Sequence, residues 1–109
     1  MTILDNVLYD EILKLNAKIN SMEEELSLLP KGCIYIRKSC GSMYVYRKWR
    51  EDDKICAEYL GKLDSPKTLA KINKVNEYKI LSQQIKKEKV RLAELKKAYK
   101  LLLTKTHLN

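Results

Sequence analysis

The feature that most constrains the fold is an apolar repeat, which appears in two long segments and is absent from the segment between them. In both segments apolar residues recur at steps of four and three, which is the spacing of one face of an α-helix. In residues 1–29 this stripe consists of Leu8, Ile12, Leu15, Ile19, Met22, Leu26 and Leu29. In residues 65–105 it consists of Tyr78, Leu81, Ile85, Leu92, Leu95, Tyr99 and Leu102, with one interruption at Glu88. The spacing predicts two long helices that pack as an antiparallel coiled-coil-like hairpin.

Two prolines mark where the helical repeat stops and where it starts again. Pro30 ends the first helix, because the residue before a proline avoids helical backbone angles. Pro66 fits the first position of the last helix, and Asp64 or Ser65 can cap that helix. We therefore predict a single domain over residues 1–109, with a helix in 1–29, a three-stranded sheet in 32–62 and a helix in 65–105.

The segment between the prolines is rich in strand-forming residues and contains two turns. Gly41-Ser42 suits a two-residue type II′ hairpin turn, and Asp52-Asp53 suits the turn that follows. Three strands with one covered face are stable, whereas a lone hairpin is marginal. The predicted fold class is α+β, with a long N-terminal helix, a three-stranded antiparallel sheet and a long C-terminal helix.

These turns fix a register and divide the sheet into two faces. The register places Ile36 opposite Arg47, Arg47 opposite Glu58, and Trp49 opposite Cys56. One face is mostly apolar and is predicted to pack on the helices; it consists of Ile34, Ile36, Met43, Val45, Trp49, Cys56 and Leu60, with the Arg47–Glu58 pair. The other face carries tyrosines, basic residues and no acidic residue; it consists of Tyr35, Arg37, Tyr44, Tyr46, Lys48, Arg50, Ile55, Ala57 and Tyr59.

The second face is the candidate nucleic-acid-binding surface. Tyrosine stacks and forms hydrogen bonds, and arginine and lysine neutralise phosphate. The predicted contact residues are Tyr35, Arg37, Tyr44, Tyr46, Lys48, Arg50 and Tyr59. An alternative interpretation is that tyrosine is present as a good strand former, with cross-strand pairs that stabilise a solvated sheet. A further alternative packs the tyrosine face on the helices and leaves Trp49 outside.

Charge is distributed unevenly along the chain. Residues 1–29 contain two basic and six acidic residues, residues 30–63 eight basic and four acidic, and residues 64–109 twelve basic and four acidic. A segregated positive charge attracts phosphate backbones or acidic protein surfaces. The alternative is that a lysine-rich helix is simply well solvated.

The predicted helices differ in length. At about 1.5 Å per residue, a helix of about 28 residues spans roughly 42 Å and one of about 38 residues roughly 57 Å. If both start at the sheet, the last helix overhangs its partner and carries Leu95, Tyr99, Leu101, Leu102 and Leu103. An exposed apolar end typically marks an interface, so Leu95, Tyr99, Leu102 and Leu103 are candidate contacts in a homodimer or with another protein. The alternative is that the end folds back or frays.

No cofactor or metal is expected from the sequence. The chain has an odd number of cysteines, namely Cys33, Cys40 and Cys56, and they form no CxxC pair and follow no signal peptide. This pattern favours free thiols in a reducing cytoplasm. Zinc needs about four ligands, and the one histidine, His107, lies near the chain end. No apolar run approaches the roughly 20 residues that would span a membrane.

Short motifs between the helices resemble two groups of proteins. Leu29-Pro30-Lys31-Gly32, Tyr44-Val45-Tyr46, Arg50 and Tyr59-Leu60-Gly61-Lys62, in this order, resemble a group of small uncharacterised bacterial and phage helix–sheet–helix proteins. Residues 32–63 also resemble the arm-site DNA-binding three-stranded sheet of phage integrases, which implies DNA contacts from Arg37, Tyr44, Tyr46, Lys48 and Arg50. The acidic turn Glu51-Asp52-Asp53 and the long flanking helices depart from that module.

Together these features predict a non-enzymatic protein of phage or mobile-element type that binds DNA or RNA. The alternative is a protein-interaction module, such as a phage-encoded inhibitor or adaptor of anti-defence type that clamps a host nuclease or ribonucleoprotein through its helices. An enzyme is not expected, because the sequence has no glycine-rich phosphate loop, no Ser/His/Asp set and no carboxylate cluster outside turns and helix faces.

Overall fold

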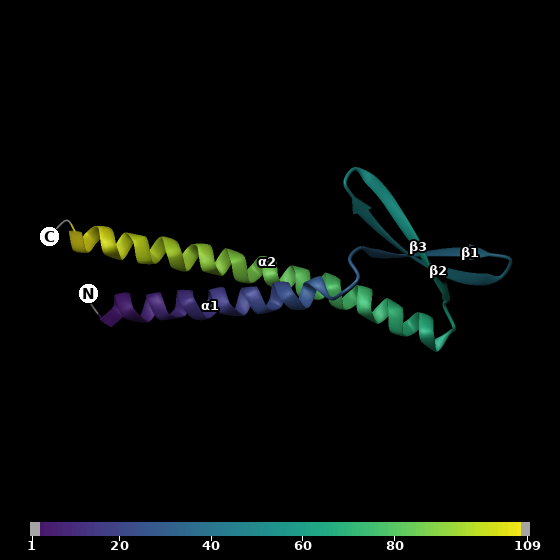
Figure 1. Cartoon of the computed structure of the whole chain (residues 1–109), viewed down its shortest axis with the longest axis horizontal. Helices are drawn as coiled ribbons and strands as arrows, with labels where there is room; N and C mark the ends of the chain where they lie inside the picture. The colour runs from purple at the N-terminus through teal and green to yellow at the C-terminus, as the bar shows by residue number, and fades with distance from the viewer. Residues whose placement is uncertain (1–2, 108–109) are drawn as a thin grey trace. The chain divides into compact units, whose positions relative to one another are not determined.

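The computed structural model describes residues 3–107, with side chains over residues 6–104. Its elements follow the chain in the order α1 (Ile3–Ser27), β1 (Cys33–Ser39), β2 (Ser42–Glu51), β3 (Lys54–Lys62) and α2 (Pro66–His107) (Figure 1). The predicted α+β class is confirmed. The chain divides into two compact units, one formed by residues up to Glu25 together with those from Gln83, and the other by residues 26–82.

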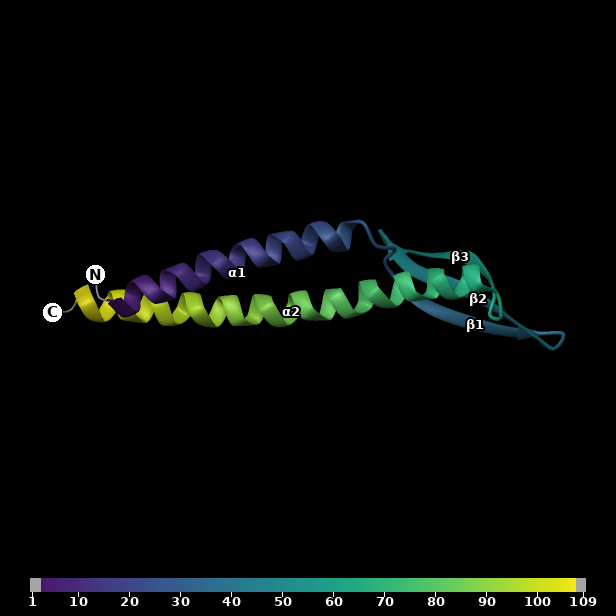
Figure 2. The same cartoon turned by 90° about the horizontal axis from the view of Figure 1, so that it is seen from below.

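The first unit is a pair of antiparallel helices. Its core contains Ile12, Leu15 and Ile19 from α1 and Leu92 from α2, with Leu95 and Tyr99 packed against them. Near the start of α1, the ring centroids of Tyr9 and Tyr99 lie 5.9 Å apart. Near the end of α1, Glu23 forms an ion pair with Lys89, with an Nζ–Oε1 distance of 2.8 Å. Contacts of this order require the helices to run in opposite directions (Figure 2). The core consists of residues from the two predicted apolar stripes.

The predicted overhang is wrong for Leu95 and Tyr99, which both lie against α1. The prediction assumed that α2 pairs with α1 from its first turn. Instead, the part of α2 before Gln83 belongs to the sheet unit, where Thr68 and Val75 are buried. Near the end of α2, Leu101 is exposed, and Leu102 and Leu103 are half-buried.

Within the residues that the structure describes, neither helix has an apolar stretch of the length that crossing a bilayer requires.

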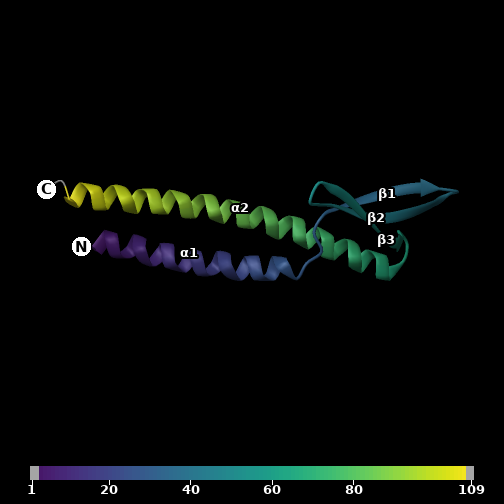
Figure 3. The ribbon, with the colours of Figure 1, turned by 45° about the horizontal axis from the view of Figure 1, so that its top comes forward.

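The second unit contains the sheet, whose strands lie in the order β1-β2-β3 and are antiparallel (Figure 3). Between β2 and β3 the predicted register is confirmed, with Trp49 opposite Cys56 and Arg47 opposite Glu58. Turn Asp52-Asp53 joins these strands, as predicted, because Glu51 pairs with Lys54 on either side of it.

Between β1 and β2 the predicted register is wrong by two residues. Ile36 pairs with Val45, and Ser39 pairs with Ser42, so the turn consists of Cys40 and Gly41. Both turn residues have positive φ, 51° for Cys40 and 79° for Gly41, and this is what a type I′ turn requires. A shift of two residues leaves every side chain on its predicted face, because side chains alternate with a period of two.

The apolar face of the sheet packs on the start of α2. Val45 and Leu60 are buried together with Thr68 and Val75 of α2. Thr68 Oγ1 donates a hydrogen bond of 3.4 Å to the carbonyl oxygen of Leu60. The cover is partial, because Ile36 and Met43 on the same face remain 47% and 43% exposed.

A bulge and a close backbone approach join β3 to α2. The register shifts between Val45 and Tyr46, so that Val45 pairs with Gly61 while Tyr46 pairs with Tyr59. Gly61 has a φ of 134°, and a Cβ atom there would collide with Oγ1 of Thr68. Glycine is therefore required at this position both by the backbone conformation and by the contact with α2.

We expect Gly61→Ala to lower the free energy of unfolding by about 1–3 kcal/mol, since it adds strain and a collision with a buried side chain. Urea denaturation followed by the fluorescence of Trp49 measures this within the sheet unit. Gly41→Ala is the matched control, because Gly41 also has positive φ but has open space where its Cβ would lie. Equal losses for the two variants would show that the contact with Thr68 is unimportant.

Candidate nucleic-acid interface

Strand alternation brings all seven predicted contact residues to one face of the sheet. The pairings Tyr35–Tyr46, Arg37–Tyr44 and Tyr46–Tyr59 place β1, β2 and β3 side by side on this face. Tyr35 and Tyr59 are 43% and 52% exposed. The face is opposite the buried Val45 and Leu60, so it is the solvent face of the sheet unit. We call it the tyrosine face; it consists of Tyr35, Arg37, Tyr44, Tyr46, Lys48, Arg50 and Tyr59, and of Lys62, which is described below.

The four tyrosine rings form a continuous row of contacts across the three strands. Ring centroids lie 6.3 Å apart for Tyr35 and Tyr46, 5.3 Å for Tyr46 and Tyr59, and 6.3 Å for Tyr44 and Tyr59. Their interplanar angles are 50°, 51° and 47°, so each ring is tilted against its neighbour. Tilted contacts at these distances are favourable for aromatic pairs and hold the rings in a defined arrangement.

The cations of the tyrosine face differ in how they are held. Lys48 Nζ lies 4.0 Å from the ring centroid of Tyr35, which is a cation–π contact. Arg37 and Arg50 are exposed. Within residues 6–104, the ion pairs involve only Lys18, Arg47, Lys74 and Lys89 as cations. The positive charges of Arg37, Lys48 and Arg50 are therefore not neutralised by a carboxylate of the described chain.

Arg47, on the opposite face, shows the contrasting arrangement. Its Nη2 and Nε atoms donate to Glu58 Oε2 at 2.7 and 3.2 Å, and its Nη1 donates to the carbonyl oxygen of Lys31 at 2.7 Å. The guanidinium also lies 3.8 Å from the ring centroid of Trp49. All of its strong contacts are thus made inside the sheet unit, which makes Arg47 a structural residue.

The bulge adds a cation to the tyrosine face that the sequence analysis missed. Tyr44 pairs with Lys62, which places Lys62 on the same face as Tyr44. If the β2–β3 pairing continued past Arg47–Glu58 without the bulge, Tyr44 would instead pair with Gly61. Gly61 could have indicated the bulge from the sequence, because a glycine inside a strand often marks one.

The acidic turn does not place Glu51 beside these cations. Trp49 Nε1 donates to Glu51 Oε2 at 3.5 Å, and both residues belong to the face opposite Arg50. The carboxylate of Glu51 therefore lies on the Trp49 side of the sheet. Glu51 therefore does not offset the positive charge of the tyrosine face.

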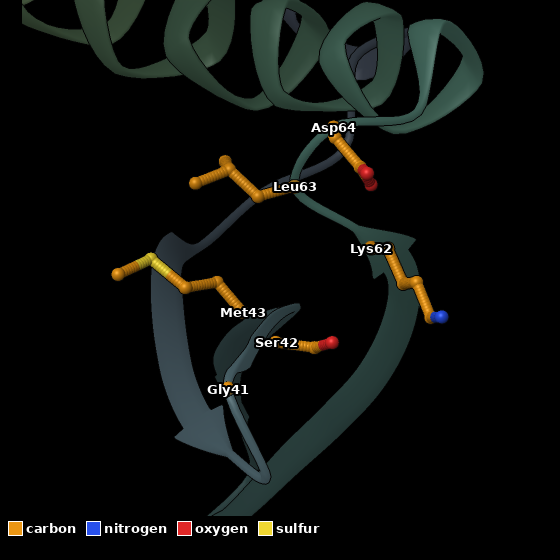
Figure 4. A pocket seen from close by; sticks show the side chains of 6 residues that line it. All are labelled: Gly41, Ser42, Met43, Lys62, Leu63 and Asp64. Carbon is orange, nitrogen blue, oxygen red and sulfur yellow. The ribbon is translucent and has the colours of Figure 1, made fainter.

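The tyrosine face includes a hollow of about 320 Å³ lined by Arg37, Ser39, Tyr44 and Tyr46. Ser39 lies on this face in both the predicted and the observed register, but it was not among the predicted contact residues because it is neither aromatic nor basic. A second hollow, of about 310 Å³, lies between the β1–β2 turn and the start of α2. In that hollow Met43 and Leu63 extend to one side, while Ser42, Lys62 and Asp64 extend to the other (Figure 4). The carboxylate of Asp64 makes the second hollow less suitable for a phosphate or another anion.

The three cysteines are free thiols; Cys33 and Cys40 are exposed, and Cys56 is half-buried. The described residues contain no group of three or more His, Cys, Asp or Glu side chains placed to hold a metal ion.

Comparisons of the chain with models of protein families, with curated proteins and with solved structures give no significant match.

We expect Arg47→Ala to lower the free energy of unfolding of the sheet unit by about 1–2 kcal/mol, because it leaves the Lys31 carbonyl without its donor. Arg50→Ala, which removes the same charge from an exposed position of the same strand, should change it by less than about 0.5 kcal/mol. Urea denaturation of both variants, followed by Trp49 fluorescence, checks this. A larger loss for Arg50→Ala than for Arg47→Ala would contradict the division into structural and surface arginines.

Proposed function

We propose that the chain is a non-enzymatic nucleic-acid-binding protein of phage or mobile-element type, acting in a reducing cytoplasm, and that it binds DNA or RNA through the tyrosine face. The observation that carries the proposal is that Arg37, Lys48 and Arg50 share one face with four contacting tyrosine rings and have no carboxylate partner among the described residues. Structural arginines satisfy their charge within the fold, as Arg47 does. Cations left without such partners are available for phosphate.

The two residue types on this face support complementary kinds of contact. Arginine and lysine bind phosphate oxygens, and binding then weakens steeply as salt rises because counterions are released. Tyrosine rings contribute stacking or sugar contacts, which depend little on salt. The lysine-rich helix α2 adds a positive field, which speeds the association of an anionic polymer without defining its position.

The triple variant Arg37→Ala, Lys48→Ala, Arg50→Ala should lose most of its affinity for nucleic acid. Titration of labelled DNA and RNA at several salt concentrations should show a slope of log K against log[salt] that is less steep by about 2–3, since each lost phosphate contact contributes roughly 0.7–0.9. Circular dichroism should show an unchanged fold, because the three side chains are not buried.

A second triple variant, Lys86→Ala, Lys96→Ala, Lys97→Ala, removes the same net charge from α2 within the helix-pair unit. We expect it to lose less affinity than the sheet variant. Wild-type affinity in the sheet variant would contradict the assignment of the tyrosine face, and undetectable binding of the unmodified protein at low salt would contradict the proposed function as a whole.

A protein-interaction module is the second candidate function, and it is favoured by apolar residues exposed on α2. Val90 and Leu101 are 60% and 57% exposed, and Leu102 and Leu103 beside the latter are half-buried. Exposed apolar side chains on one helix suit a partner helix. The partner would be a second copy of the chain, a host nuclease or a ribonucleoprotein, and the protein would act as an inhibitor or adaptor.

If α2 mediates self-association, multi-angle light scattering should give twice the chain mass at high protein concentration. Leu101→Lys, which places a charge at an exposed apolar position, should return the protein to a monomer without loss of helix content. Leu13→Lys is the matched control, because Leu13 is similarly exposed on α1. A monomer at every concentration would exclude the homodimer.

A further inference from the structure

We infer that the tyrosine face binds single-stranded nucleic acid, and that one unpaired base occupies the hollow formed by Arg37, Ser39, Tyr44 and Tyr46. The inference rests on the proposed function and specifies which form of nucleic acid the same surface takes. It is drawn from the hollow itself and from the exposed rings around it.

The hollow has the size and lining of a site for a single nucleotide. Its volume of about 320 Å³ lies at the lower end of the range of about 300–1,000 Å³ that small-molecule sites occupy. A base in a duplex cannot enter such a hollow, because both of its faces are covered by its stacked neighbours. A base in a single strand is free to turn out of the strand and enter it.

Each side chain around the hollow has a role in holding a nucleotide. The rings of Tyr44 and Tyr46, on alternate positions of β2, offer apolar surface for a base. Arg37, which pairs with Tyr44 across the β1–β2 ladder, offers a planar guanidinium that binds a base edge or a phosphate. The Ser39 hydroxyl donates to Cys40 Sγ at 3.9 Å, and its oxygen is an acceptor for a base edge at the end of β1.

Rings outside the hollow extend the surface along a strand. The Tyr59 ring is 52% exposed and contacts both Tyr44 and Tyr46, so a neighbouring base has a second aromatic surface beside the first. Tyr35 differs, because Lys48 Nζ lies over its ring. We therefore expect bases at Tyr44, Tyr46 and Tyr59, and a phosphate near Lys48.

The test compares one sequence as a single strand and as a duplex. Fluorescence anisotropy with the full chain should give at least tenfold tighter binding of a labelled single-stranded DNA or RNA 12-mer than of the corresponding DNA duplex at the same salt concentration. Tyr44→Leu and Tyr46→Leu should each weaken single-strand binding by about five- to tenfold, in line with the loss of one stacked base. Because these substitutions change no charge, the salt slope should stay as in the unmodified protein.

Two further variants separate stacking from a general loss of structure. Tyr44→Phe should keep wild-type affinity, since the ring is retained. Tyr35→Leu, a matched loss of a ring that lies under Lys48, should change the affinity less than Tyr44→Leu does. Urea denaturation monitored by Trp49 fluorescence identifies any variant that does not fold.

Each outcome bears on the inference in a defined way. Equal or tighter binding of the duplex, or wild-type single-strand affinity in folded Tyr44→Leu, would overturn the inference and leave the proposed function standing. Absence of binding to every nucleic acid at low salt would overturn both. A free 5′-mononucleotide that competes as well as the labelled strand would show that the hollow binds a nucleotide in isolation, and would overturn its placement in a strand.

Discussion

The burial of Val45 and Leu60 against the first part of α2 determines which side of the sheet meets solvent. Both side chains are at most 7% exposed, and Thr68 Oγ1 donates to the Leu60 carbonyl beside them. Because side chains alternate along a strand, fixing these two residues also fixes the side on which Tyr44, Tyr46 and Tyr59 lie. The solvent face of the sheet is therefore a consequence of a small apolar contact on its other side.

The basic residues of the sheet fall into two groups that share a charge and differ in surroundings. Arg47 is held by Glu58, by the Lys31 carbonyl and by the Trp49 ring. Arg37 and Arg50, on the opposite face, have no such carboxylate partner among the described residues. Composition alone treats these three arginines as equivalent, whereas the register separates the one that stabilises the sheet from those that are free to meet an anion.

Much of the fold follows from period and turn chemistry, and the errors have identifiable physical causes. The β1–β2 register could not be predicted, because Cys40-Gly41 and Gly41-Ser42 are both acceptable two-residue turns. Both faces of the sheet could still be predicted, because the registers that these two turns give differ by two residues. Lys62 was missed because the bulge decides its position, and Ser39 was missed because it is neither aromatic nor basic. The expected overhang failed because an apolar repeat does not reveal that the first part of α2 packs with the sheet and the rest with α1.

The type I′ turn at Cys40-Gly41 and the bulge near Gly61 also constrain how such a chain can diverge in evolution. Lengthening or shortening the β1–β2 hairpin by two residues at its tip leaves each tyrosine on the same side of the sheet. A change of one residue within the paired part of β1 would turn Tyr35 toward the apolar face and Ile36 away from it, unless a bulge or a three-residue turn restored the alternation. Changes of hairpin length by an even number therefore preserve both faces directly, and the bulge in the β2–β3 ladder shows how one additional residue is accommodated without reversing the faces.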